Sequence, residues 1–404
     1  IILPIVYKEK VKTNKTRFQK LLDLSELPPL AKKLKSQKKK IVFTIGSFNL
    51  LQPGQCRYLA EAKSNGDILV VGVTSDISER IKGAEFPLIS EDIRKELLAF
   101  LKVVDYIISV DERNPYDVLL LLQPDIFYTV EQSWDSGART KSDKQICKMT
   151  GTKITVSPTY YPYYTTNDLV EHIANIRVIK ILENYLKDRV DGFSLNPDKD
   201  LKPADFGLQT PTNKQAYDPK HQILDMQSLA TLKKKHNRAK ICLVGGSFDL
   251  LHIGHARFIE QAALNGDILV VGIPSDAVIR YTKGVGRPII SDYSRAYTLC
   301  HLDPVDYVAI FDGGTVFNCI EVLQPDVFYT VDEDWNKAYK SSKEYKYVKK
   351  YGGEVVVGPR QAPLTSSSGI IDKLAQRKVK EIFRECMDEE KYQKILNELP
   401  KLRK

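Results

Sequence analysis

Two histidines within one short segment are the residues whose types and spacing best indicate chemistry. His252 and His255 lie in GSFDLLHIGH, residues 246–255, which directly follows an apolar run typical of a buried strand. If this segment turns into a helix, both imidazoles can face one pocket at the helix N-terminus, where free N–H groups and partial positive charge favour phosphate. They could then stabilise charge in a transition state. The alternative is a pair of structural histidines, but the order of strand, turn and helix favours a functional site.

The segment that carries these histidines occurs twice in the chain of 404 residues. GSFNLLQPGQCRYL at 46–59 returns as GSFDLLHIGHARFI at 246–259, an offset of 200 residues. NGDILVVGVTSD at 65–76 returns as NGDILVVGIPSD with the same offset. After one inserted residue the offset becomes 201, as for QPDIFYTV at 123–130 and its second version. Matches that stay in register over this length predict two copies of one domain.

Domain boundaries are predicted from the repeat and from composition. The first copy is expected at 24–189 and the second at 225–389, with an N-terminal extension at 1–23 and a basic C-terminal tail at 390–404. Residues 190–224 are rich in Pro, Asp, Lys and Asn and have no apolar period, which predicts a linker. The chain starts without Met, so we expect a fragment or a processed form.

Strands and helices are predicted to alternate within each copy. The first copy's apolar runs are IVFTIG, DILVVGV, DYIISV, DIFYTV and KITV, and the second copy has an equivalent for each. Helical segments separate the runs, and a helix is predicted to start at Arg57 or Arg257 after each Gly-Ser-Phe turn. This alternation predicts an α/β domain with a parallel sheet buried on both faces. Ligands of such sheets bind beyond the carboxyl ends of the strands.

Composition excludes several classes of protein. Hydrophobic residues make up 43% of the chain, as in ordinary globular proteins, and no apolar stretch reaches the ~18 residues of a membrane span. The net charge of +9 would suit nucleic acid or small anions such as nucleotides, but no nucleic-acid-binding module supports the first. The six cysteines form no C-x-x-C pair and no zinc-finger spacing, so no protein metal site is predicted and a reducing compartment, the cytoplasm, is expected.

The motif resembles the H-x-G-H signature of nucleotidyltransferases, which join a nucleoside triphosphate to a phosphorylated substrate and release pyrophosphate. Aminoacyl-tRNA synthetases share HIGH but also need a Lys-Met-Ser-Lys-Ser loop that this chain lacks. The blocks KIVFTIGSFNLL, GDILVVGIPSD, KGVGRPI, PVDYVAIF, LQPDVF and YGGEVVV most resemble the heptose-1-phosphate adenylyltransferase (ADP-heptose synthase) family. The tandem is similar to ethanolamine-phosphate cytidylyltransferase. The resemblance implies two tandem Rossmann-like domains with parallel sheets, and Mg²⁺ bound with the triphosphate.

The resemblance implies roles for individual residues of the second copy. The lysine of the Lys-Gly pair would meet the triphosphate, although by itself a lysine is usually a solvated side chain. A serine run before the last helix would hold nucleotide phosphates, with plain helix capping as the alternative. The implied catalytic residues are His252, His255 and Lys283; the nucleotide-binding residues are Gly246, Ser247, Phe248, Gly254, Arg295, Ser366, Ser367 and Ser368; the acceptor-binding residues are Asp249, Thr330 and Arg360.

The first copy departs from the signature. Gln52 and Gln55 replace the two histidines and Asn49 replaces the aspartate. Glutamine is neutral and cannot supply positive charge. The family residues that remain in this copy are Lys82, Arg94, Thr165 and Thr166. The first copy is therefore expected to be poor at transfer, whether or not it binds a nucleotide.

The substrates are left with alternatives. ATP and a sugar phosphate are favoured by the longer family match. Thr330 stands where the family has a lysine, so the acceptor is expected to differ from heptose 1-phosphate or to be held by another cation such as Arg360. One alternative is CTP with phosphoethanolamine or glycerol 3-phosphate, and another is a nucleotide-sensing pseudoenzyme. The expected partners are thus small molecules and not nucleic acid, with the two copies paired inside one chain.

Overall fold

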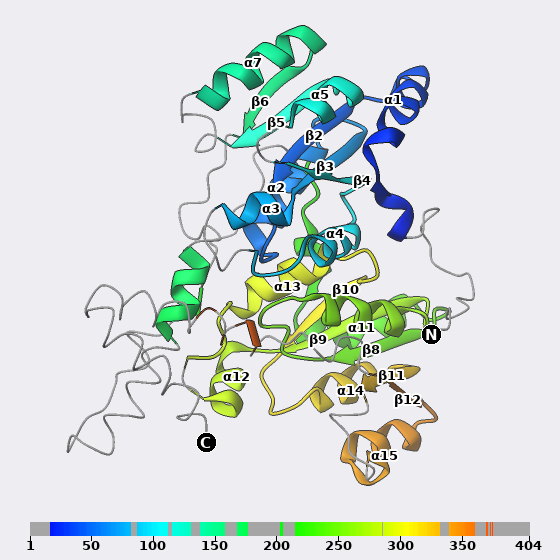
Figure 1. The fold of residues 1–404 in the computed structure, drawn as a ribbon. Helices are drawn as coiled ribbons and strands as arrows, with labels where there is room; N and C mark the ends of the chain where they lie inside the picture. Colours follow the sequence, from blue (N-terminus) through cyan, green and yellow to red (C-terminus); the bar gives the residue numbers. More distant parts are fainter. Residues whose placement is uncertain are drawn as a thin grey trace, which may run out of the picture.

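A computed structural model shows each copy built around its own sheet (Figure 1). The structure describes residues 17–81, 87–111, 115–130, 138–157, 168–176, 203–204, 215–284, 286–331, 339–359, 369–370, 372 and 374. No helix in these ranges is long and apolar enough to cross a membrane.

Both sheets have six strands, and all their strand pairs are parallel. The first has the order β1-β4-β3-β2-β5-β6 and the second the equivalent order β12-β11-β8-β9-β10-β7. The predicted fold class, two tandem α/β domains with parallel sheets, is therefore confirmed. The strands are β1 (Leu21–Leu22), β2 (Ile41–Gly46), β3 (Ile68–Thr74), β4 (Tyr106–Val110), β5 (Ile126–Val130), β6 (Lys153–Ser157), β7 (Ile223–Leu224), β8 (Ile241–Gly245), β9 (Ile268–Pro274), β10 (Tyr307–Phe311), β11 (Val327–Val331) and β12 (Glu354–Gly358).

Helices connect the strands, as parallel pairing requires. The α-helices are α1 (Leu27–Ser36), α2 (Pro53–Lys63), α3 (Asp76–Arg80), α4 (Glu91–Ala99), α5 (Tyr116–Leu122), α7 (Ala138–Thr150), α10 (Met226–Lys235), α11 (Ile253–Ala263), α12 (Asp276–Lys283), α13 (Asp292–Cys300), α14 (Phe317–Leu323) and α15 (Lys343–Lys350). Short 3-10 turns are η1 (Arg17–Lys20), η2 (Leu24–Glu26), η3 (Pro219–Gln222) and η5 (Tyr339–Ser341).

The helix after each Gly-Ser-Phe turn starts four residues earlier than predicted. The prediction placed the starts at Arg57 and Arg257, whereas α2 begins at Pro53 and α11 at Ile253. The residue before each helix has extended backbone and serves as the N-cap, and the ring of Pro53 suits a first helical position. The earlier start brings the signature histidines into the first turn of α11.

The strand order places this helix start at the point where the sheet reverses direction. From β8 the chain adds β9 and β10 on one side, then returns to add β11 and β12 on the other. Ligand crevices of parallel sheets form at such a switch point, beyond the carboxyl ends of the strands. The turn after β8 lies at that edge, next to the end of β11.

One hydrophobic cluster contains buried residues of both copies. It includes Leu98 and Phe100 from α4 and its end, and Tyr297 and Leu299 from α13. Further clusters pack on the other face of each sheet, one within each copy. Helices α4 and α13 lie between the two sheets in Figure 1. The two sheets thus have outer cores of their own and share an inner one.

Backbone hydrogen bonds also join the copies at equivalent positions. Leu101 and Leu302 form an antiparallel bridge. The amide of Lys102 donates to the carbonyl of His301 over 3.0 Å, and the amide of Asp303 donates to the carbonyl of Phe100 over 2.7 Å. Residues 101 and 302 correspond under the offset of 201, so the contact is nearly two-fold symmetric.

His301 is fully buried beside this bridge. Its Nδ1 contacts the carbonyl of Tyr297 at 2.9 Å, and its ring packs against Tyr217 and Tyr297. Burial lowers the pKa of His301 from its usual value near 6.5 to about 4, although the contact with the Tyr297 carbonyl acts in the opposite direction. Between about pH 6.5 and pH 4 the folded protein therefore keeps this imidazole neutral, whereas in the unfolded chain it would be protonated.

We predict that the protein becomes less stable in acid because His301 is protonated on unfolding. Because the unfolded chain binds the proton more readily, the free energy of unfolding should fall by roughly 2 kcal/mol between pH 7 and pH 5 on this account. Urea unfolding of the wild type and of His301→Gln at both pH values should show a shallower pH slope in the variant. His221→Gln, at an exposed position, should keep the wild-type slope. Equal slopes in all three proteins would contradict the prediction.

Candidate active site

The conformation of the turn between β8 and α11 depends on the residue types at Gly246 and Phe248. Phe248 has a positive φ of 44°, and its ring folds back over Gly246. A Cβ on Gly246 would lie 2.8 Å from this ring, so any larger residue would displace it. The first copy repeats the arrangement with Phe48 at φ 50° and the same close approach to Gly46. The turn after β2 and the turn after β8 therefore have the same structure.

The two signature histidines stack on one another at the start of α11. Their ring centroids are 3.7 Å apart with 23° between the planes, and the Phe248 ring meets the ring of His255 edge-on at 5.0 Å. His252 is the N-cap residue and is only 7% exposed, while His255 is half-buried in the first turn. The structure thus brings both imidazoles to the helix N-terminus, where an anion is favoured. Half-buried Gly254 lies between them on the same turn.

Lys283 reaches the same turn from the end of α12. Its Nζ donates a hydrogen bond to Oγ of Ser247 over 2.7 Å. The lysine is exposed, and Gly284 follows it with a positive φ of 81°, which ends the helix. An exposed ammonium beside two imidazoles gives this edge of the sheet a cationic character suited to a phosphate chain.

Arg295 lies beneath the turn rather than at its surface. The guanidinium is 2% exposed and donates to the carbonyls of Ser247 (2.8 Å), Ile290 (2.9 Å) and Pro274 (2.8 Å) and to Oδ1 of Asp276 (3.1 Å). Burial raises the pKa of Asp276, with the nearby Asp292 acting in the same direction and Arg295 opposing both. These contacts hold the turn, and the predicted contact with a nucleotide stays a prediction.

Asp249 also points into the protein. Its Oδ1 accepts hydrogen bonds from the amides of Ile289 (2.7 Å) and Ile290 (3.1 Å), and its Oδ2 pairs with Nε of Arg287 at 3.0 Å. The side chain is 1% exposed. Asp249 therefore ties the histidine turn to the loop that follows Lys283, and its predicted contact with the acceptor stays a prediction.

The remaining predicted residues divide between the sheet edge and undescribed segments. Thr330 is buried near the end of β11, opposite Val357 of β12. The predicted residues outside the described part of the chain are Arg360, Ser366, Ser367 and Ser368, and in the first copy Lys82, Thr165 and Thr166.

Comparison with known proteins agrees with this geometry. A family model described as cytidylyltransferase-like matches residues 43–169 and 243–378, which is more than half of the chain. The chain belongs to the cytidylyltransferase-like family. The predicted membership of the nucleotidyltransferase superfamily is confirmed by this match, which covers both copies.

Several relatives of this cytidylyltransferase-like chain are similar over part of their length. Bifunctional protein HldE of Geotalea uraniireducens is 38% identical over 162 residues, 40% of this chain and 32% of that protein. Bifunctional protein HldE of Helicobacter pylori strain G27 is 44% identical over 116 residues, 29% of this chain and 25% of that protein. The chain thus spans about a quarter to a third of the length of these curated relatives. A lipopolysaccharide core biosynthesis protein of Thermoplasma volcanium has a solved structure that is 29% identical, covering 29% of this chain and 93% of its own, with a TM-score of 0.26.

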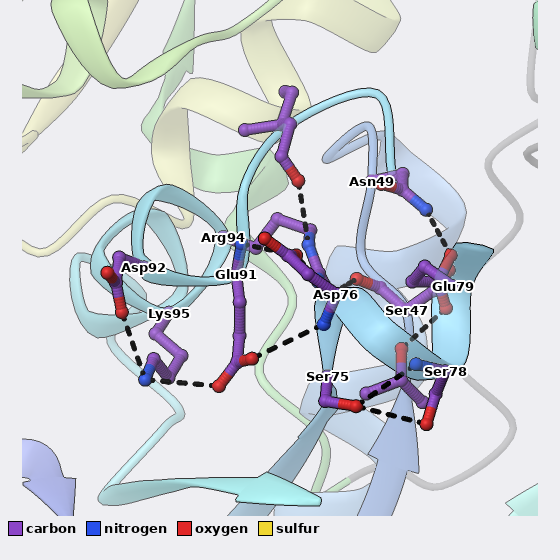
Figure 2. A network of polar contacts seen from close by, with 12 residues as sticks. Ser47, Asn49, Ser75, Asp76, Ser78, Glu79, Glu91, Asp92, Arg94 and Lys95 are labelled. Atoms are coloured by element: carbon purple, nitrogen blue, oxygen red, sulfur yellow. Dashed lines mark hydrogen bonds and ion pairs between the residues drawn. The ribbon is translucent and has the colours of Figure 1, made fainter. Parts of the chain in front are cut away.

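The first cytidylyltransferase-like copy keeps the supporting arginine but changes the surface of the site. Arg94 donates to the carbonyl of Ser47 (2.7 Å) and to Asp76 (2.8 Å), as Figure 2 shows, and also to the carbonyl of Ile89 (2.9 Å). Arg295 makes the equivalent contacts in the second copy. Because a copy without the histidines retains this network, the arginine serves the turn itself and does not mark a catalytic site.

Gln52 closes the helix N-terminus of the first copy. Its Oε1 accepts a hydrogen bond from the amide of Gly54 over 2.6 Å, so the protein's own side chain occupies a donor that a phosphate would use. His252, at the equivalent position, caps α11 without a side-chain hydrogen bond of this kind. Glutamine in place of histidine therefore removes a side chain that can carry positive charge. It also occupies the amide of Gly54, which could otherwise bind a phosphate.

A buried carboxylate replaces the aspartate–arginine pair of the second copy. Glu79, fully buried, accepts hydrogen bonds from Asn49 Nδ2 and from Thr74 Oγ1, each over 2.6 Å (Figure 2). In the second copy Ile279 stands where Glu79 does, and Arg287 stands where the first copy has Phe86. The first copy thus has one buried carboxyl bound to Asn49 where the second copy has the oppositely charged pair of Asp249 and Arg287.

Sequence reasoning missed Arg287 although it lies in the family block KGVGRPI. The available signal was that the first copy differs at both members of the pair, with Asn49 for Asp249 and Phe86 for Arg287. One pair of differences between two copies does not establish a contact, so only the structure placed Arg287 beside Asp249.

We predict that Asp249 stabilises the loop mainly as an acceptor of main-chain hydrogen bonds. Asp249→Ala would leave two buried amides without their acceptor and should lower the free energy of unfolding by about 1–3 kcal/mol. Asp249→Asn keeps an oxygen for these amides, as Asn49 does toward Leu88 in the first copy, and should cost clearly less. Urea unfolding of both variants tests the order. Equal losses in the two variants would contradict the prediction and show that the ion pair with Arg287 dominates, since both variants remove it.

Proposed function

We propose that the second copy is a nucleotidyltransferase. It would transfer a nucleoside monophosphate, AMP being favoured, from a nucleoside triphosphate to a phosphorylated acceptor such as a sugar phosphate, releasing pyrophosphate. The observation that carries the proposal is the stacked pair of His252 and His255 at the start of α11, with Lys283 beside them, at the switch point of a parallel sheet.

The transfer needs no protein nucleophile. An oxygen of the acceptor phosphate attacks the α-phosphorus in line, a new P–O–P linkage forms, and the bond from the α-phosphorus to the oxygen bridging to the β-phosphate breaks, so that pyrophosphate leaves with both electrons. The imidazoles and the helix N-terminus would bind phosphate oxygens where charge develops. Lys283 would lie near the α- and β-phosphates and offset the charge that develops there. The protein contributes position and positive charge.

Mg²⁺ is proposed to enter with the triphosphate. Within the described residues, no group of three or more His, Cys, Asp or Glu side chains is placed to hold a metal ion. Asp249, the carboxylate nearest in sequence to the histidines, is already bound to Arg287. These residues fit a cation that is held mainly by phosphate oxygens and water, which is the usual manner for Mg²⁺ on a nucleotide.

The two candidate substrate pairs are supported by different observations. The blocks KGVGRPI, LQPDVF and YGGEVVV resemble ADP-heptose synthases and favour ATP with a sugar phosphate. The family description and the tandem arrangement favour the second candidate, CTP with a phospho-alcohol. Pyrophosphate release from ATP and from CTP, each with heptose 1-phosphate, glycerol 3-phosphate and phosphoethanolamine, separates them. Turnover that requires CTP would overturn the ATP assignment.

The first copy is proposed to act as an intramolecular partner without transfer activity of its own. The capping by Gln52 and the buried Glu79 support its inactivity, and the shared hydrophobic cluster supports the pairing. The proposed location is the cytoplasm. Five cysteines in the described part of the chain are buried as free thiols, which suits a reducing compartment.

His255→Ala is predicted to lower turnover by about 10²–10³, the usual loss for one donor to a developing negative charge. His255 is half-buried and is not the N-cap, so the variant should fold. Steady-state pyrophosphate release measures the effect, with His221→Ala as a control at an exposed position. A folded His255→Ala protein with wild-type turnover would remove His255 from the mechanism.

A second variant gives the second copy the two glutamines that the first copy has at the equivalent positions. The full chain with His252→Gln and His255→Gln should lose at least ~10³ of its turnover, because both imidazoles are removed and the glutamine that replaces His252 can cap α11. The first copy is unchanged in this protein. Residual turnover of about half the wild-type value would show that the first copy transfers as well.

A further inference from the structure

Helix α4 of the first copy binds helix α11 of the second copy through a carboxylate. Glu96, 8% exposed, accepts two hydrogen bonds from one guanidinium, from Nε of Arg257 to Oε1 over 2.9 Å and from Nη2 of Arg257 to Oε2 over 2.6 Å. Such two-point pairs are stronger than ordinary ion pairs and fix the orientation of both groups. The pair joins residues 161 positions apart in the chain.

A second arginine extends the contact along α11. Nη2 of Arg17 lies 3.1 Å from Oε1 of Glu96, and its Nη1 donates to Oε2 of Glu260 over 2.6 Å. The same guanidinium packs over the ring of Phe100 at 4.3 Å. Arg257 and Glu260 are three residues apart on α11 and so share one face of it. Two adjacent side chains of that helix are thus bound to residues of the N-terminal half of the chain.

The helix that is held in this way carries the signature histidines. His252 caps α11, His255 lies in its first turn, and Arg257 is only two residues further on. A helix moves as a rigid rod, so any rotation or slide permitted at Arg257 would displace both imidazoles. In-line transfer tolerates little displacement, since a shift of about 1 Å can cost ~10²-fold in rate.

The inactive copy provides a natural comparison. Arg57, the equivalent of Arg257, pairs with Glu61 on its own helix at 3.3 Å. The residue equivalent to Glu96 is Tyr297, which has no carboxylate to offer. At the first of these equivalent pairs of positions an ion pair joins the copies and binds the histidine-bearing helix, whereas Arg57 pairs with a carboxylate of its own helix. Both copies have the same fold, so this difference between them is associated with the histidine site and not with the fold.

We infer that Glu96 is a positioning residue that the first copy contributes to the active site of the second, by fixing α11 through Arg257. This inference rests on the proposed transfer activity. It gives the first copy a task that its lack of histidines does not prevent. Because Glu96 acts through its bond to Arg257, its loss should slow the chemical step and leave substrate binding nearly unchanged.

The test is a double-mutant cycle on the full chain. Glu96→Gln and Arg257→Gln should each lower kcat about tenfold, less than the loss for a 1 Å displacement, with KM for both substrates within about twofold. The double variant should be no slower than either single one, because the second change removes a contact already lost. Arg257→Lys keeps the charge without the two-point geometry and should give an intermediate kcat.

Lys95→Gln is the matched control on the same helix. Lys95 pairs with Glu91 and Asp92, both at 3.2 Å and both within the first copy (Figure 2). Its removal should leave kcat within about twofold of the wild type. A folded Glu96→Gln protein with lowered thermal stability and unchanged kcat, or a cycle in which the two losses simply multiply, would overturn the inference.

A measurement without substrate separates this inference from the proposed function. Imidazole NMR signals of His252 and His255, assigned with His→Gln variants, should shift in Glu96→Gln and in Arg257→Lys and stay in place in Lys95→Gln. Unmoved signals would overturn the positioning role whatever the activity. Wild-type protein that turns over none of the substrate pairs, with signals that do shift, would overturn the proposed function and leave the mechanical link standing.

Discussion

A single buried guanidinium organises the active edge of the second copy. Arg295 collects the carbonyls of Ser247, Pro274 and Ile290 and the carboxylate of Asp276, and so joins the histidine turn, the end of β9, the start of α12 and the loop before α13. A buried charge is tolerated only when it is fully paired, and removing one partner of such a group usually costs ~3–5 kcal/mol. The elements that bring Lys283 and the histidines together are therefore held in one arrangement.

The two copies separate the requirements of the fold from those of chemistry. Both keep the strand order, the positive φ of the turn phenylalanine and the arginine beneath it, although only one has the histidines. The features they share are those that a buried parallel sheet and a tight turn demand. The features that differ are Gln52 in place of His252 and the Asn49–Glu79 contact in place of the Asp249–Arg287 pair. The architecture is the same with and without the histidines.

Much of the candidate site could be predicted because it is local. The strand, turn and helix are contiguous in sequence, so His252, His255 and Ser247 had to be neighbours once the helix began. The start of α11 was placed four residues too late, because the extended N-cap that begins it depends on backbone angles, which composition does not reveal. Arg295 and Asp249 were recognised as members of a pattern, but their burial depends on loops from elsewhere in the chain. A residue's type did not show whether it faces the ligand or the core.

The sequence by itself determined the duplication, the α/β class, the parallel strands and the identity of the histidine-bearing copy. Periodicity, repeat register and residue type can be read from the sequence without knowledge of the three-dimensional structure. Only the tertiary structure decided that Arg287 faces Asp249 and that Glu96 faces Arg257. The reason is physical: a guanidinium and a carboxylate distant in the chain become partners only when packing removes both from water. For Glu96 and Arg257 that packing is the shared core between the copies, which no local pattern encodes.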